Sequence, residues 1–256
     1  MNNLTNKELR LAVLIDADNV SHTHVKEMLE EIAKSGTPTI KRIYADWTKP
    51  LVNGWKNVLL ENAITPIQQY GYTSGKNSTD SALIIDAMDI LYSEKVEGFC
   101  IVSSDSDFTR LATRLREAGM KVIGIGEQKT PKPFITACDK FIYIEILKGD
   151  DTPTTEKTVK SKGAEKAQGP AAPLNSINPA LTKLLTKSAA DLADDSGWTY
   201  LGDLGNFIVK KRTDFDPRNY GFPKLLPLIK STDRFDIDER ETGKGNIRHI
   251  YIRVKQ

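Results

Sequence analysis

Cysteine, histidine and long apolar runs are all scarce in this sequence. It holds two cysteines, Cys100 and Cys138, which form no Cys-x-x-Cys pair, and three histidines, none of which lies near a cysteine in the chain. A zinc or thiolate cluster needs such ligands close together, so none is predicted. No apolar stretch approaches the roughly 20 residues of a membrane span, and the opening MNNLTNKELR resembles no signal peptide. We expect a reduced protein of the cytoplasm with no membrane association.

A charge excess of either sign is also missing. Lysine and arginine number 36 against 34 acidic residues, which leaves a net charge of +2 at pH 7. The total therefore indicates no particular class of partner, and only the distribution of charge can do so. The 39% apolar and 27% charged residues are typical of a globular protein. A chain of 256 residues is long enough for one sizeable core and a small second domain.

What the sequence does contain, through its first 147 residues, is a regular alternation of apolar runs and helix-like segments. The apolar runs are followed by segments with a helical period, and this order predicts right-handed crossovers and a largely parallel sheet covered on both faces. We therefore expect an α/β domain over residues 1–147. The predicted strands cover 11–15, 40–45, 64–69, 98–103, 121–125 and 141–146, and the predicted helices cover 24–35, 52–62, 79–94, 107–118 and 132–138.

The composition changes after this domain. Residues 148–178, rich in Thr, Lys, Glu, Ala, Gly and Pro, show no apolar period, so they predict a flexible linker. Apolar order returns in a second domain over 179–256. Three predicted helices (179–194, 200–210 and 219–230) precede two alternating strands (235–240 and 247–254) with the Gly-rich tip ETGKGN between them. This order is the outline of a winged helix.

Carboxylates follow two of the predicted strands. The segment LIDADN places Asp16 and Asp18 with Asn19 after the first strand, and SSDSDF places Asp105 and Asp107 after the fourth. Ligands of an open parallel sheet bind at these carboxyl ends. Asp80, in the first turn of an apolar helix, is a further candidate for the same edge. Carboxylates brought together without a cation repel one another, so this set predicts Mg²⁺ or Mn²⁺.

Plainer roles stay open for several of these residues. Asp18 could only support the turn, Asp80 could only favour the helix N-terminus, and either Asp105 or Asp107 could cap the following helix. Asp86 and Asp89, on another face of the helix that carries Asp80, are expected to be solvated. The loop residue Lys76 could meet a phosphate or lie in solvent.

Together, LIDADN, KNSTDSALIIDAMDILYS, GFCIVSSDSDFTRLATRLREAGMKVIGIG and KTPKPFITACDKFIYIE resemble the NYN domain of the LabA-like group, a branch of the PIN-like nucleases. The resemblance covers about residues 10–147. It implies a ribonuclease that depends on Mg²⁺ or Mn²⁺ and leaves a 5′-phosphate and a 3′-hydroxyl. The resemblance implies that Asp16, Asp80 and Asp105 hold the metal, that Asp107 either holds it or positions the attacking water, and that Asn19 and Ser104 act in support.

The tail resembles the OST-HTH or LOTUS domain, most specifically in FDPRNYGFPKL. That resemblance implies binding of RNA, which we expect to be single-stranded, or in some members binding of a protein. The basic residues expected to contact RNA phosphates are Lys76, Lys210, Lys211, Arg212, Arg218, Lys224 and Lys244. Solvated surface charge is the plain alternative for each of them. The sequence indicates no oligomeric state.

Two other functions remain open. LIDADNV also fits the DxDx(V/T) nucleophile motif of haloacid-dehalogenase-like phosphatases, with Asp16 phosphorylated and Asp18 as acid and base. Those proteins usually insert a turn and a hairpin after the first strand, whereas HTHVKEMLEEIAKSG runs directly into a helix. A non-catalytic adaptor that binds RNA or protein is the other possibility, because turnover depends on the exact placement of the carboxylates.

Overall fold

The computed structural model describes residues 8–71, 78–147, 173–241 and 248–255. These residues fall into two compact units. The first comprises residues 8–147 and 202–215, and the second comprises residues 173–201 and 216–255. The first unit holds a six-stranded sheet and the second a three-stranded sheet. No helix in the described ranges combines the length and the apolar character needed to cross a bilayer.

The large sheet is entirely parallel, as predicted, with the order β3-β2-β1-β4-β5-β6. Its central strands are buried on both faces, which explains their continuous apolar runs. Two strand ends differ from the prediction. Strand β2 begins at Thr37 rather than at residue 40, and a short 3-10 turn replaces the last three residues of the predicted strand 141–146. The strands are β1 (Arg10–Asp16), β2 (Thr37–Ala45), β3 (Thr65–Gln68), β4 (Gly98–Val102), β5 (Lys121–Gly126) and β6 (Lys140–Tyr143).

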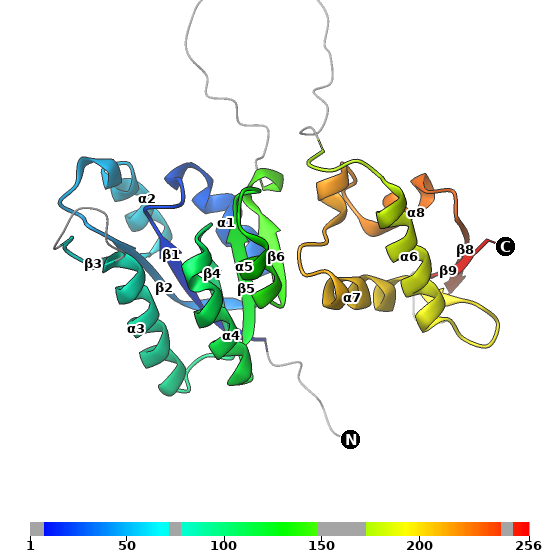
Figure 1. Cartoon of the computed structure of the whole chain (residues 1–256), viewed down its shortest axis with the longest axis horizontal. Coiled ribbons are helices and arrows are strands. Elements are labelled where there is room, and N and C mark those ends of the chain that lie inside the picture. The colour runs from blue at the N-terminus through cyan, green and yellow to red at the C-terminus, as the bar shows by residue number, and fades with distance from the viewer. Residues whose placement is uncertain (1–7, 72–77, 148–172, 242–247, 256) are drawn as a thin grey trace, which may run out of the picture. The chain divides into compact units, whose positions relative to one another are not determined.

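Helices cover both faces of this sheet (Figure 1). On one face, α1 and α2 pack on Leu11, Val13 and Ile15 of β1, which belong to the main apolar core. On the other, α3 lies against β1 and β2, and α4 against β5. The helices are α1 (Val25–Ala33), α2 (Trp55–Asn62), α3 (Ser78–Tyr92), α4 (Thr109–Glu117) and α5 (Lys132–Ala137), with 3-10 turns η1 (His22–His24), η2 (Pro50–Val52), η3 (Ser106–Phe108) and η4 (Ile144–Ile146).

The order of the strands also fixes where a ligand can bind. From β1 the chain moves outward to β2 and β3, and it then returns through α3 to β4 on the other side of β1. Connections diverge at this point, and in open α/β sheets ligands bind in the crevice outside the carboxyl ends of such strands, here β1 and β4. The predicted acidic residues after both strands therefore lie at the switch point of the sheet.

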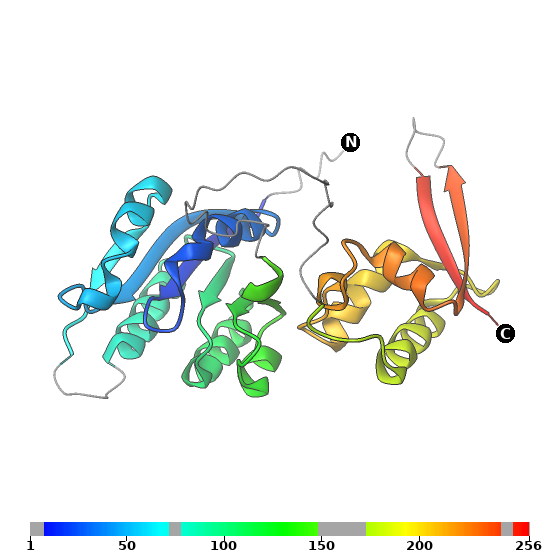
Figure 2. The ribbon, with the colours of Figure 1, turned by 90° about the horizontal axis from the view of Figure 1, so that it is seen from above.

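After residue 172 the chain forms helices and a small antiparallel sheet of order β7-β9-β8. The predicted winged-helix order is present, although a 3-10 turn and a short helix take the place of the third helix. In Figure 2 the strands β8 and β9 (orange and red) run side by side next to the helices of their unit. The elements are α6 (Pro179–Leu192), β7 (Thr199–Tyr200), α7 (Leu201–Lys211), η5 (Pro217–Tyr220), α8 (Leu225–Ser231), β8 (Phe235–Glu241) and β9 (Arg248–Val254).

The predicted linker, 148–178, lies mostly outside the described residues, as does the hairpin tip 242–247. The domain boundaries at 147/148 and 178/179 therefore stay predictions. One local feature can be described: α6 begins at Pro179, and the Asn178 side chain caps it by accepting a hydrogen bond from the Leu181 N–H at 2.9 Å. An asparagine cap followed by proline in the first helical position is a strong start signal for a helix.

Candidate functional site

Asp16 is the last residue of β1, and its side chain is almost completely buried, with 1% exposed. One carboxylate oxygen accepts a hydrogen bond from the Asp18 N–H at 3.1 Å. The other accepts from the Asn19 amide and from the Ser103 hydroxyl, each at 2.7 Å. Burial nevertheless raises the pKa of Asp16 above its usual value, and these three hydrogen bonds offset only part of the effect.

Ser103 joins the ends of β1 and β4. Its hydroxyl donates to Asp16 and accepts a hydrogen bond from the Asp105 N–H at 3.0 Å. The sequence pointed instead to its neighbour, Ser104, whose hydroxyl accepts from the Glu127 N–H at 2.8 Å and so ties β4 to the end of β5. Ile15 pairs with Val102, so Asp16 and Ser103 are the next residues along the two strands. The pairing between β1 and β4 therefore shows that Ser103, and not Ser104, contacts Asp16, and this pairing cannot be read from the sequence.

Asp105 and Asp107 lie on the turn that follows β4. Asp105 caps η3, since one of its carboxylate oxygens accepts a hydrogen bond from the Asp107 N–H at 2.9 Å. The capping role considered from the sequence is therefore present, and it uses only one oxygen of Asp105. Asp107 sits inside η3 with its side chain exposed. The turn thus presents two carboxylates toward the crevice in a short, well-defined stretch of chain.

Asp80, in the first turn of α3, meets these two residues from the other side. Carboxylate oxygens of Asp80, Asp105 and Asp107, one from each residue, all lie within 4.8 Å of one another. Burial raises the pKa of Asp80 to about 6, and the negative charges of Asp16, Asp105, Asp107 and Asp18 add to the effect in that order. Five carboxylates from three separate segments therefore share one electrostatic environment.

This donor set fits a divalent cation. Three carboxylates offer the hard oxygen ligands that Mg²⁺ and Mn²⁺ prefer. Burial first and the neighbouring negative charges second raise the pKa of Asp80, so a positive charge bound beside it would lower the cost of ionising it. Asp16 is buried and is not one of the three, and its hydrogen bonds hold Asn19 and Ser103 in place. The geometry accommodates an ion through Asp80, Asp105 and Asp107, with Asp16 as a buried support.

Three other acidic residues of the sequence analysis do not belong to the cluster of Asp80, Asp105 and Asp107. Asp18 is exposed, and Asp89 is exposed on α3. The expectation that Asp86 is solvated is wrong: it is half-buried, forms an ion pair with Arg42 and accepts a hydrogen bond from the Tyr44 hydroxyl. Arg42 and Tyr44 both belong to β2, so Asp86 fastens α3 to the sheet.

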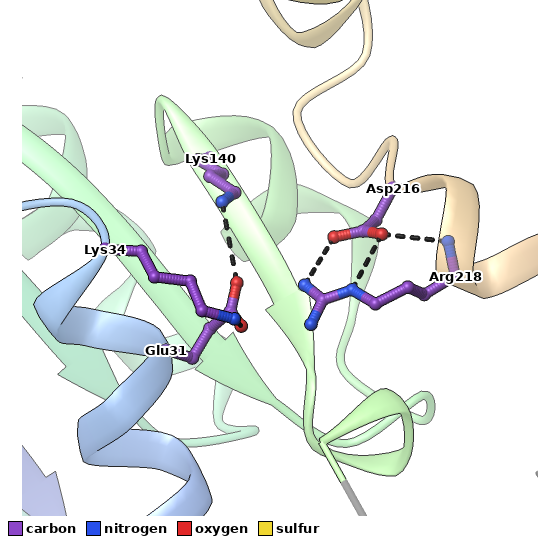
Figure 3. Close-up of polar contacts among 5 residues, drawn as sticks. All are labelled: Glu31, Lys34, Lys140, Asp216 and Arg218. Carbon is purple, nitrogen blue, oxygen red and sulfur yellow. Dashed lines mark hydrogen bonds and ion pairs between the residues drawn. The ribbon is translucent and has the colours of Figure 1, made fainter. Parts of the chain in front are cut away.

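The basic residues named from the sequence are spread over several environments. Arg212 forms an ion pair with Asp214 at 3.0 Å, and Arg218 forms one with Asp216 at 2.6 Å, the latter visible in Figure 3. Their charges are thus partly compensated. Lys211 lies 4.2 Å from the centre of the Phe207 ring. Lys210 and Lys224 are exposed, whereas Lys76 and Lys244 lie outside the described residues.

A second group in Figure 3 belongs to the framework of the sheet. Glu31 of α1 is buried, with 4% exposed, and pairs with Lys34 at 2.7 Å and with Lys140 of β6 at 3.9 Å. Lys140 is the first residue of β6, so this pair lies toward the amino ends of the strands, away from the acidic crevice. A buried carboxylate flanked by two ammonium groups is balanced and needs no further ligand.

Comparisons with solved structures give three partial likenesses. An uncharacterized protein of Nitrosomonas europaea is 32% identical over 40% of this chain and 93% of its own, with a TM-score of 0.30. A protein of unknown function from Vibrio parahaemolyticus is 20% identical over 57% of this chain and 98% of its own, with a TM-score of 0.48. A protein fragment from Chromobacterium violaceum is 30% identical over 33% of this chain and 89% of its own, with a TM-score of 0.26.

No curated protein matches the chain. Two domain families match parts of the chain. The OST-HTH/LOTUS domain matches residues 172–247, which include α6 to β8. The NYN domain matches residues 10–145, more than half of the chain and the whole of the six-stranded sheet with its acidic crevice. The chain belongs to the NYN domain family and carries an OST-HTH/LOTUS domain after it.

Proposed function

We propose that this protein is a metal-dependent ribonuclease with an RNA-binding tail. The observation that carries the proposal is the approach of Asp80, Asp105 and Asp107 to within 4.8 Å at the switch point of an NYN domain. NYN domains belong to the PIN-like nuclease superfamily, which supports a phosphodiester hydrolase. The motifs of the first domain favour the LabA-like group, and the oxygen ligands favour Mg²⁺ or Mn²⁺.

Each acidic residue has a distinct task in this proposal. Asp80 and Asp105 would hold the ion, while the exposed Asp107 would either join them or orient the attacking water. Asp16 and Ser103 act from behind, because their hydrogen bonds set the position of Asn19 and of the Asp105 backbone. A bound ion would supply a water of lowered pKa and would offset the charge that builds on the scissile phosphate. The water oxygen would add to phosphorus as the bond to O3′ breaks, O3′ would take up a proton to become a 3′-hydroxyl, and the other fragment would end in a 5′-phosphate.

The OST-HTH/LOTUS domain supports RNA as the substrate class. The exposed Lys210 and Lys224 could meet phosphates, and Lys211, Arg212 and Arg218 could exchange their present partners for them. The predicted linker of about 30 residues would span about 30 Å as a flexible coil. A tail that holds single-stranded RNA would raise the local concentration of substrate at the acidic crevice without taking part in the chemistry.

The test is cleavage of labelled single-stranded RNA by the full chain with Mg²⁺, Mn²⁺ or a chelator. We expect metal-dependent cutting that Asp16→Asn and Asp105→Asn each abolish. Asp89→Asn is the matched control, because it makes the same change on the exposed face of α3. Circular dichroism confirms that each variant is folded. Undiminished cutting by both Asp16→Asn and Asp105→Asn would refute the assignment of the site.

The same experiment separates the other functions. A phosphomonoester serves as a second substrate, and its hydrolysis without RNA cleavage would indicate a phosphatase. In this fold, however, the chain passes from β1 through η1 into α1 with no intervening hairpin, unlike haloacid-dehalogenase-like phosphatases. RNA binding without cleavage under either metal would identify an adaptor. Binding of neither substrate would point to the tail as a protein-docking module.

A further inference from the structure

The small sheet of the second unit carries aromatic residues on the face that turns away from its helix. Thr199 and Ile252 pair across β7 and β9, are buried at 2% and 0% exposed, and point toward α6, whose Ala189 carbonyl accepts from the Thr199 hydroxyl. Side chains alternate along a strand, so Tyr200 and Tyr251, the next pair, point the other way. We call this outward side, with Trp198, Tyr200, Arg240, His249, Tyr251 and Arg253, the aromatic face.

These six side chains form a continuous row. The Arg253 guanidinium lies 4.7 Å from the Trp198 ring centre, and the Arg240 guanidinium lies 5.4 Å from Trp198 and 4.1 Å from Tyr251. Tyr251 is 5.7 Å from Tyr200, and Tyr200 is 5.0 Å from His249. The four rings are each half-buried, so part of each ring meets solvent. The outward side of an antiparallel sheet is ordinarily polar, which makes four rings in a row unusual.

The charges of the aromatic face are balanced. Arg240 donates to Asp238 at 2.8 Å, and Arg253 donates to Asp236 at 3.1 Å. Two guanidinium groups thus meet two carboxylates on the same strands. Each guanidinium carries five N–H donors, and the side chains are 41% and 46% exposed, so donors remain for a ligand. A surface that offers planar groups and donors but little net charge suits bases better than a phosphate backbone.

We propose that the aromatic face binds the bases of single-stranded RNA by stacking, an inference that rests on RNA binding by the tail in the proposed function. Every base has a π face that can lie on an aromatic ring or an Arg plane, and each stacked base is worth about 1–3 kcal/mol. In a duplex the bases already stack on one another, so the face distinguishes single strands from duplexes. Protein hot spots instead favour side chains enclosed in desolvated pockets, whereas these rings lie half-exposed on a sheet.

The test is fluorescence anisotropy of a labelled single-stranded RNA with the full chain in chelator, so that no cleavage interferes. Tyr251→Leu keeps apolar bulk but removes the π face, and we expect it to weaken binding about 5- to 150-fold, the range of one stacked base. Tyr251→Phe keeps the ring and should stay within about twofold of the wild type. Tyr200→Leu gives a second, independent position, and circular dichroism verifies that all three variants are folded.

Salt dependence separates stacking from phosphate contacts. Since Tyr251 meets no phosphate in this proposal, Tyr251→Leu should lower affinity without changing the slope of log affinity against log salt. Replacing Lys210, Lys211 and Arg212 together by Ala should instead make that slope shallower. A duplex of the same sequence should bind the wild type more weakly, and Tyr251→Leu should hardly change its affinity.

Several outcomes would overturn the inference. Wild-type affinity in both Leu variants would show that the face is structural or docks a protein, even if the wild type binds and cuts RNA as proposed. Equal losses in Tyr251→Leu and Tyr251→Phe would assign the effect to the hydroxyl rather than to stacking. Metal-dependent cutting by a chain that shows no tail-dependent RNA binding would retain the nuclease and reject the aromatic face. RNA binding that depends on the aromatic rings, without any RNA cleavage, would retain the aromatic face and reject the nuclease.

Discussion

Replacement of Asp80 by Asn should stabilise the metal-free protein. The pKa of Asp80 rises from 3.8 to about 6 in the folded chain, first through burial and then through the neighbouring carboxylates. Between these two values the folded state holds more protons than the unfolded state, so the free energy of unfolding falls as pH rises through this window. Above pH 6 the full penalty of an ionised Asp80 is present. Asn has nearly the same shape and no charge, so it removes that penalty.

The magnitude follows from the size of the shift. A shift of about two units at 1.36 kcal/mol per unit gives a ceiling of about 3 kcal/mol. Asp80 is only half-buried, and solvent screening reduces the figure to about 1 kcal/mol. For a domain of this size, that corresponds to a rise of about 2–4 °C in the melting temperature. At pH 4 Asp80 is mostly protonated in the folded state, so the difference between the two proteins should nearly vanish.

Thermal unfolding, monitored by circular dichroism in chelator at pH 4 and pH 8, tests the predicted stabilisation by Asp80→Asn. Adding Mn²⁺ at pH 8 should then reverse the order, because an ion that binds only the folded state stabilises the wild type more than Asp80→Asn. Asp89→Asn should show neither effect. A lower melting temperature for Asp80→Asn than for the wild type at pH 8 in chelator would contradict the claim that burial and the neighbouring carboxylates make an ionised Asp80 unfavourable.

Three further predictions concern cleavage. Asp107→Asn should lose at least tenfold in rate, about 1.4 kcal/mol of transition-state stabilisation, while Asp89→Asn keeps the wild-type rate; equal rates in a single-turnover assay would remove Asp107 from the site. Ser103→Ala should lower the rate more than Ser104→Ala, since only Ser103 bonds to Asp16 and to the Asp105 N–H, and the reverse ranking would reject its positioning role. A fragment ending near Lys148 should cut short RNA at saturating concentration but bind it more weakly and with a shallower salt slope than the full chain; identical binding curves would argue against an RNA tether.

Most strands of the large sheet could be predicted because each is marked by its own apolar residues. A strand buried on both faces must be apolar at every position, as in Leu11–Ile15 and Gly98–Val102, and such runs stand out from a single sequence. Strand ends were less predictable. The first residues of β2 are partly exposed, which weakens their apolar signal. The sixth strand was predicted too long, because Ile144 and Ile146 are apolar but belong to the 3-10 turn η4.

Some residues of the candidate site could be predicted from the sequence, and others depend on how distant strands pair. Asp16, Asp105 and Asp107 could be named because they follow recognisable strands, and Asp80 because it begins an apolar helix. The NYN motifs then supported all four. Ser103 could not be separated from Ser104, because that choice depends on the register between β1 and β4. The aromatic face was missed for a similar reason. Its rings come together only through the pairing of the two-residue strand β7 with the distant β9, and a strand so short leaves no periodic signal.

Asp86 shows why helix phase alone is a poor guide to importance. Lying six positions after Asp80 on α3, it points away from the crevice, yet its bonds to Arg42 and Tyr44 fasten the helix to β2. Burial and the Asp86 charge also raise the pKa of Tyr44, so its hydroxyl stays protonated and can donate. Loss of this anchor would let α3 rotate or shift and so move Asp80 relative to Asp105. Asp86 therefore cannot serve as a neutral control for the acidic site, whereas Asp89, exposed on the same helix, can.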